Sequence, residues 1–231
     1  MSKKLIFIFI FLYPNFAICE YASLLVYKVW EKGSPSYITR ILVTDKYVRL
    51  DDGADGGDFT LFDRKNESVY NISVKERAVL TIEPIGKKIP ENNILILDEK
   101  KSSDPSAPMI SGKKPFRIDF LANGELCGSV IAVSDLMENA LIALREFRLV
   151  LARVHADTQA TQPDILQTAC DLASNIHAPT RTLDYGLPIE EFRGENIQLL
   201  LDLKEKFEVE SSMFVIPEDY RSMKLPSLPA I

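Results

Sequence analysis

Short apolar stretches separated by turn residues dominate the first third of the chain. Between residues 36 and 83 each stretch ends at Asp, Gly, Asn or Lys, and the next begins after about ten residues. This spacing is typical of an antiparallel meander, in which every strand turns directly back on its neighbour. We expect strands at residues 37–44, 47–50, 59–62, 69–72 and 79–82, preceded by one at 21–30.

Several of these strands carry apolar residues at adjacent positions rather than at every second one. Ile41-Leu42-Val43 and Val79-Leu80 are examples. A sheet with one face in water alternates between apolar and polar residues, whereas a sheet covered on both faces does not. We therefore expect other parts of the chain to pack against both faces of this sheet.

The strand pattern continues on both sides of a polar segment. After a short edge strand at 94–97 and a solvated loop at 98–114, strands at 116–121 and 126–133 flank Asn123-Gly124, a strong hairpin signal. In the C-terminal part of the chain the same pattern predicts strands at 181–185, 189–193 and 196–204, linked through 186–188 and 194–195. Residues 213–216 are expected to close the sheet.

The periodicity changes to that of a helix after residue 134. Asp135 can cap a helix with Glu138 reaching back, and an apolar stripe follows at Leu136, Ala140, Leu144, Phe147, Leu151 and Val154. Arg145, Glu146, Arg148 and Arg153 fall off this stripe and can meet water. A second helix is predicted from about Pro163 to Ile176, with Ile165, Ala169, Leu172 and Ile176 on one face.

These elements predict an α+β fold, a curved and mainly antiparallel open β-barrel with two amphipathic helices packed over its concave face. Residues 20–223 would form one domain with a helical insertion at 134–178, and 224–231 a loose tail. The helices can leave an apolar cavity above the sheet. Candidate ligand-binding residues are Leu61, Ile72 and Leu80 of the sheet, facing Leu144, Phe147 and Leu151 of the helix; the alternative is a dry core.

The N-terminus resembles an export signal. Lys3 and Lys4 precede an apolar run from Leu5 to Leu12, and small residues stand near Cys19. We expect residues 1–19 to be a signal peptide cleaved near Cys19, and the mature protein to be periplasmic or secreted. Two alternatives remain: the run is a membrane anchor, although it is short for one, or Cys19 is lipidated.

Cleavage there leaves two cysteines, Cys127 and Cys170, in a compartment where disulfides persist. We expect them to form a bridge that attaches the second helix to the sheet. The alternative is two buried free thiols.

Charge and motifs exclude several functions. A net charge of −6 without a basic cluster disfavours nucleic acid as a partner. The chain holds two histidines and none of the common hydrolase, phosphate-binding or zinc motifs, so we expect no enzyme, no cofactor and no metal. A Cys170–His177 pair on one helical face is conceivable, but a helix-terminal histidine explains His177 better. The Asp- and Gly-rich loop 51–58 lacks the ligand pattern of an EF-hand and is interpreted as a hairpin connection.

The layout resembles a known family. The N-terminal signal, the segment from Ile38 through 61–64 (Leu-Phe-Asp-Arg) to Ile82, and the ending 213–220 are similar to the open β-barrels of bacterial outer-membrane lipoprotein carriers and their uncharacterised periplasmic relatives. The cysteine pair resembles the latter more. The resemblance implies a barrel of about eleven strands with helices over its mouth, binding acyl chains or another apolar ligand.

The sequence therefore favours an exported, non-enzymatic protein that binds a lipid or other apolar ligand. The alternative is a structural or assembly protein of the cell envelope, with a barrel filled by its own side chains and a protein partner.

Overall fold

The computed structural model describes residues 19–86, 88–92, 94–103, 107–159 and 168–224. They form one curved, open sheet of twelve strands in the order β12-β6-β5-β4-β3-β2-β1-β11-β10-β9-β8-β7. Neighbouring strands are antiparallel except β12 and β6, which are parallel. The strands are β1 (Cys19–Trp30), β2 (Tyr37–Val43), β3 (Tyr47–Asp51), β4 (Phe59–Asp63), β5 (Ser68–Ser73), β6 (Ala78–Ile82), β7 (Leu97–Ser102), β8 (Phe116–Ala122), β9 (Glu125–Val133), β10 (Leu187–Arg193), β11 (Asn196–Glu210) and β12 (Arg221–Lys224).

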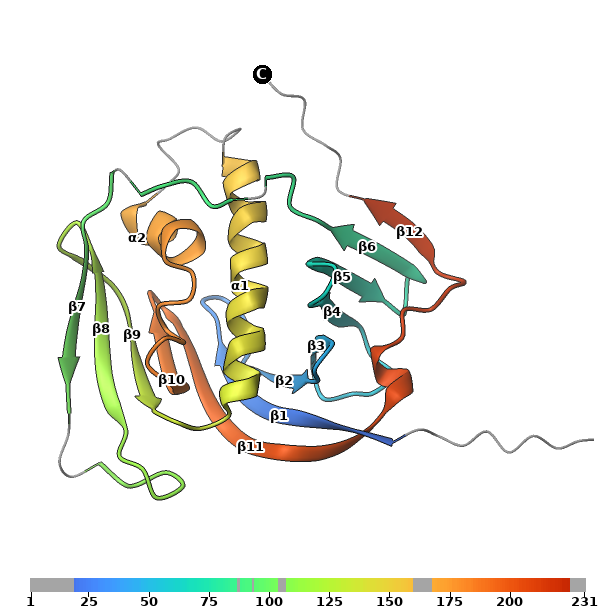
Figure 1. Cartoon of the computed structure of the whole chain (residues 1–231), viewed down its shortest axis with the longest axis horizontal. Coiled ribbons are helices and arrows are strands. Elements are labelled where there is room, and N and C mark those ends of the chain that lie inside the picture. Colours follow the sequence, from blue (N-terminus) through green and yellow to red (C-terminus); the bar gives the residue numbers. More distant parts are fainter. Residues whose placement is uncertain (1–18, 87, 93, 104–106, 160–167, 225–231) are drawn as a thin grey trace, which may run out of the picture.

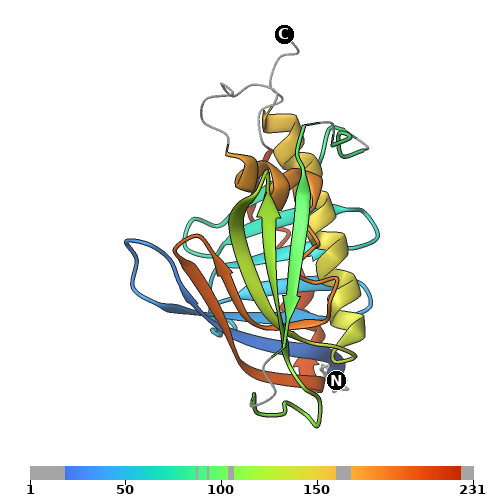
Figure 2. The ribbon, with the colours of Figure 1, turned by 90° about the vertical axis from the view of Figure 1, so that its left-hand side faces the viewer.

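Figure 1 shows the sheet curving from β7–β9 on the left, through β11 and β1 below, to β6 and β12 on the right, with α1 (Glu138–Gln159) on its concave side. In Figure 2 the β7–β9 part faces the viewer, and α1 runs along one side. The predicted α+β class and the curved open sheet are confirmed. No helix among the described residues is long and apolar enough to cross a bilayer.

Hairpins build most of this sheet. β2 to β6 follow one another in space as in the sequence, as the meander pattern predicts. Ala122 pairs with Glu125 across the predicted two-residue turn, where Asn123 and Gly124 have φ of 51° and 82°. Two consecutive positive φ angles are the condition for the tight turns that match strand twist, and Asn-Gly meets it at low cost.

The concave face holds the main core. Leu25, Ile41, Val48, Phe62 and Val69 are buried against α1. The rings of Phe62 and Phe147 lie 5.3 Å apart, which joins the middle of α1 to β4.

The C-terminal segment, residues 211–220, covers the convex face. Leu42, Leu61 and Ile72 are buried there together with Val209 and Phe214, the latter in the short helix η3 (Ser211–Phe214). The expectation that both faces are covered is thereby confirmed. Adjacent apolar residues in β4 serve different cores, since Leu61 faces outward and Phe62 inward.

The second helix is shorter than expected. α2 (Ala169–Leu172) begins after Thr168, whose side-chain oxygen accepts from the N–H of Asp171, and continues as the π-helix η2 (Ala173–His177). Because Thr168 is an extended N-cap, a continuous helix from Pro163 is wrong. Pro163 and Ile165 themselves lie outside the described residues, as do residues 1–18 of the predicted signal and 225–231 of the predicted tail.

The start of α1 also differs from the expectation. Asp135 does not cap the helix: its φ is 54°, and its carboxylate lies 3.0 Å from the Lys113 ammonium. The first helical bond instead runs from the N–H of Leu141 to the carbonyl of Met137. Two residues between the end of β9 and α1, Asp135 and Met137, have left-handed backbone conformations with φ of 54° and 57°. They turn the chain from the end of β9 into α1.

The polar side of α1 contacts protein as well as water. Glu146 binds Arg64 at 2.6 Å, and Arg153 binds Glu67 at 2.8 Å. Arg145 donates to the carbonyl of Leu183. These contacts fix α1 along its flanks, in addition to its apolar stripe.

Three strand predictions are wrong. Residues 181–185 form turns, and the sheet resumes at β10 after Gly186, whose φ of 128° and close approach to the Val133 carbonyl exclude a side chain. Residues 213–216 do not join the sheet; β12 does, and Lys224 of the expected tail belongs to it. The edge strand is β7 rather than 94–97, so part of the predicted loop 98–114 is a strand of charged residues.

Candidate functional site

A cavity of about 420 Å³ lies between α1 and the concave face of the sheet; we call it the α1 cavity. α1, β1, β2, β3, β10, β11 and η2 all contribute to its walls. It is open to solvent on one side, where the exposed Glu31, His155 and Asn196 stand.

One wall of the α1 cavity is apolar. Leu144, Phe147 and Leu151 come from α1 at spacings of three and four residues, which place them on one side of a helix. Opposite them the sheet contributes Val29, Ile41 and Leu50. Ile41 pairs directly with Leu50 across β2 and β3, so both side chains point to the same face. This wall can hold a hydrocarbon segment.

The other end of the α1 cavity is polar. The carboxylate of Glu191 is buried and lies 2.8 Å from the Arg193 guanidinium and 3.4 Å from that of Arg148. Burial raises the pKa of Glu191, but the charges and hydrogen bonds of Arg148 and Arg193 outweigh burial and hold this pKa below its ordinary value. Glu191 is therefore ionised at neutral pH.

The buried, uncharged side chain of Tyr27 lies beside Glu191 and Arg148. Its hydroxyl donates to the carbonyl of Pro188 at 3.0 Å. Burial raises the pKa of Tyr27, with a further contribution from the charge of Glu191. The phenol stays protonated and contributes a fixed hydroxyl rather than a base.

The predicted ligand-binding residues lie in three places. Leu144, Phe147 and Leu151 line the α1 cavity. Leu61 and Ile72 belong to the core of the convex face, so the expectation that they face α1 is wrong; Phe62 occupies that place. Leu80 is partly buried beside β12, where it lines a separate groove of about 450 Å³. That these residues bind a ligand stays a prediction.

Sequence reasoning missed the charged end of the α1 cavity. Glu191 and Arg193 share a face of β10 because they are two residues apart, and that face points to the helix. The sequence holds one indication of this. The apolar Ile189 lies two residues before Glu191, so strand alternation places both on one face, and an apolar residue there indicates that the face is buried.

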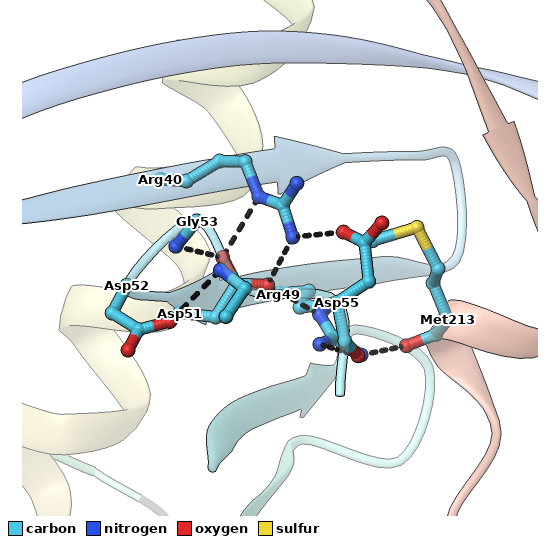
Figure 3. A network of polar contacts seen from close by, with 8 residues as sticks. Arg40, Arg49, Asp51, Asp52, Gly53, Asp55 and Met213 are labelled. Carbon is cyan, nitrogen blue, oxygen red and sulfur yellow. Dashed lines mark hydrogen bonds and ion pairs between the residues drawn. The ribbon is translucent and has the colours of Figure 1, made fainter. Parts of the chain in front are cut away.

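The convex face carries a second polar cluster, drawn in Figure 3. Asp51 accepts from the guanidinium groups of Arg40 at 2.8 Å and Arg49 at 2.7 Å, and from the N–H of Gly53 at 2.9 Å. Arg49 also donates to the carbonyl of Met213, and its guanidinium lies 3.9 Å from the centre of the Phe59 ring. The cluster therefore attaches the C-terminal segment to β3.

This geometry agrees with the interpretation of residues 51–58 as a hairpin connection. Asp51 and Asp52 accept from N–H groups two residues ahead, which is the Asx-turn role of aspartate, and Gly53 has a φ of 95°. The described residues contain no group of three or more His, Cys, Asp or Glu side chains arranged to hold a metal ion.

The predicted bridge between Cys127 and Cys170 is present, with the Cα atoms 5.0 Å apart. It joins β9 to α2 and lies in a small apolar cluster with Ala122 and Ala173. Because Cys170 is in the disulfide, it offers no thiolate to His177, and the conceivable Cys–His pair is absent.

Comparison with known proteins gives little guidance. No family model and no curated protein matches the chain. Two solved structures of PNGF-II, in space groups C2 and P21, align with TM-scores of 0.40 and 0.38 and identities of 11% and 8%. Each alignment covers 89% of this chain, which spans about a third (31% and 32%) of the length of the PNGF-II chains.

Proposed function

We propose that this chain is an exported, non-enzymatic protein that binds a lipid or another apolar molecule in the α1 cavity. The observation that supports this most is the cavity itself, about 420 Å³ between Phe147 and Leu151 of α1 and the apolar strand residues opposite. Protein ligand pockets typically have roughly 300–1,000 Å³, with mostly apolar walls and a few fixed polar groups. The α1 cavity has this size, and it combines an apolar wall with a few fixed polar groups at one end.

Export rests on two features. The first nineteen residues have the pattern of a signal peptide. The Cys127–Cys170 bridge is of a kind that persists in oxidising compartments such as the periplasm and is rare in the cytosol. The resemblance of the sequence to lipoprotein carriers points to the same place and to the same class of ligand.

A fluorescent apolar probe, N-phenyl-1-naphthylamine, tests the proposal. We expect saturable binding that Leu151→Trp weakens at least tenfold, because the indole fills the cavity from α1. Ile142→Trp is the matched control, since Ile142 lies on the same helix and is 46% exposed. Val29→Trp fills the cavity from the opposite wall and serves if Leu151→Trp does not fold. Absent binding, or equal binding by cavity and control variants, contradicts the proposal.

A second candidate is an envelope assembly protein that acts through a protein partner. The contact between Phe62 and Phe147 favours it, because it shows that part of the concave side is filled by the protein's own side chains. Cross-linking in intact cells that captures one defined partner, together with failure of the probe to bind, would support this candidate over the first.

A further inference from the structure

The polar end of the α1 cavity carries more positive than negative charge. Arg148 of α1 and Arg193 of β10 share the single carboxylate of Glu191. The hydrogen bonds of Arg148 to Thr182 and to the carbonyl of Pro179 add no negative charge. Two guanidinium groups and one carboxylate leave a surplus of one positive charge.

A third arginine stands behind this pair. Arg181 is 7% exposed and, with Glu191 and Arg193, lines a small recess. Its guanidinium donates to the Leu121 carbonyl at 3.4 Å and the Ser174 hydroxyl at 3.3 Å, and it forms no ion pair with a described carboxylate.

Among the described residues Arg181 forms no ion pair, although the carboxylate of Glu99 acts on its charge. Burial lowers the pKa of Arg181, while the charge of Glu99 opposes this effect. Glu99 pairs with Phe120, whose ring lies 5.0 Å from the Arg181 guanidinium, so Glu99 is on the same face of the sheet as Arg181, where it accepts from the Tyr185 hydroxyl. An arginine side chain keeps its proton in proteins, so Arg181 adds to the positive potential at Arg193.

The positive groups are within reach of a ligand. The Arg193 side chain is 41% exposed and that of Arg148 is 25% exposed, and both line the α1 cavity next to its apolar wall. Glu31, the other carboxylate of the lining, lies at the opening and accepts from the Tyr37 hydroxyl at 2.9 Å. Guanidinium groups pair well with planar carboxylates and with phosphates.

We propose that Arg193 and Arg148 bind the anionic head group, a carboxylate or a phosphate, of an amphipathic ligand whose hydrocarbon chain lies against α1. This inference rests on the proposed function and specifies its ligand class. The acidic protein as a whole repels anions, so the preference comes from this end of the cavity and not from net charge.

Calorimetric titration of the full mature protein with dodecanoate, dodecyl phosphate and dodecanol tests the inference. The three share one chain and differ in the head group. We expect at least one anion to bind tenfold or more tightly than dodecanol, and the comparison of the two anions identifies the head group. Arg193→Gln should reduce the ratio of anion to alcohol affinity at least fivefold.

Arg117→Gln is the matched control. Arg117 is 44% exposed and bound to Asp119 at 2.8 Å, but it lies outside the α1 cavity, so its loss should leave the ratio unchanged. Equal binding of dodecanol and both anions, or equal ratios in Arg193→Gln and wild type, overturns the inference while leaving the proposed function standing. Failure of all three compounds to bind contradicts the proposed function and the inference with it.

Discussion

The guanidinium Nε of Arg49 lies 2.7 Å from the carboxylate Oδ2 of Asp51, and the two side chains keep only 2% and 0% of their solvent exposure. They occupy positions on the convex face where neighbouring strands carry Leu42 and Leu61. A buried charge is tolerated only while its partner is present, because the remaining charge otherwise stands unpaired in a poorly polar environment.

Asp51→Asn should therefore lower the free energy of unfolding by about 3–5 kcal/mol, the range for breaking one partner from a buried pair. Urea denaturation followed by circular dichroism measures it. Asp55→Asn is the control: Asp55 also binds Arg40, but its side chain is 72% exposed, so its loss should cost about 1 kcal/mol or less. Equal costs for the two variants would contradict a structural role of the Arg49–Asp51 pair.

The same carboxylate predicts a pH dependence of stability. Burial raises the pKa of Asp51, but hydrogen bonds from Arg40, Arg49 and the Gly53 N–H outweigh it and lower this pKa below its ordinary value. Such a group stabilises the fold above its unfolded pKa of about 3.9, and this contribution is lost as the pH falls through the lower, folded value. The difference in unfolding free energy between wild type and Asp51→Asn should shrink below about pH 4. A constant difference from neutral to acidic pH would refute this assignment.

Removing the disulfide should destabilise the protein. The bridge closes a loop of 43 residues, for which the chain-entropy model gives about 3–5 kcal/mol. Cys127→Ser/Cys170→Ser should lower the urea midpoint accordingly and speed amide exchange in α2 and η2, which the bridge joins to β9. An unchanged urea midpoint and unchanged amide exchange in the double variant would contradict a stabilising role of the bridge.

The C-terminal segment should contribute strongly to the stability of the fold, although residues 211–220 form no strand of the sheet. Phe214 is 5% exposed and its ring stacks 6.1 Å from that of Tyr47. Phe214→Ala should cost about 3–5 kcal/mol in unfolding free energy, as for other buried phenylalanines. Val215→Ala, at a neighbouring residue that is 58% exposed, should cost less than about 0.5 kcal/mol. A cost below that of the control would mean that the segment does not cover the convex core.

The elements that the sequence predicts well are those specified by local chemistry. The Asn123-Gly124 hairpin and the meander from β2 to β6 follow from turn residues and strand period. The strand β7 was missed because all its residues are exposed, so it has no apolar period; its charges are typical of an edge strand that must not pair with other chains. Residues 181–185 carry a strand-like composition, but Gly186 and the packing of Leu183 under α1 hold them in turns.

The candidate site was predicted only on its helical side. Leu144, Phe147 and Leu151 were found because helical period assigns them to one face. Alternation alone does not say which face of a strand points inward when both are buried, and Leu61 was therefore assigned to the wrong side. Glu191 and Arg193 are two residues apart on one strand, but Arg148 reaches Glu191 through a contact between residues 43 positions apart, which no local pattern encodes.

Photoaffinity labelling tests the binding account most directly. Dodecanoate with a diazirine near the end of its chain, activated on the mature protein and mapped by peptide mass spectrometry, reports where the hydrocarbon lies. The account predicts labels on the cavity side of α1, around Phe147 and Leu151, and on the facing strands β1 and β2, all removed by excess unlabelled dodecanoate. Labels confined to the convex face or to the groove beside β12, or no label that excess ligand removes, would contradict it.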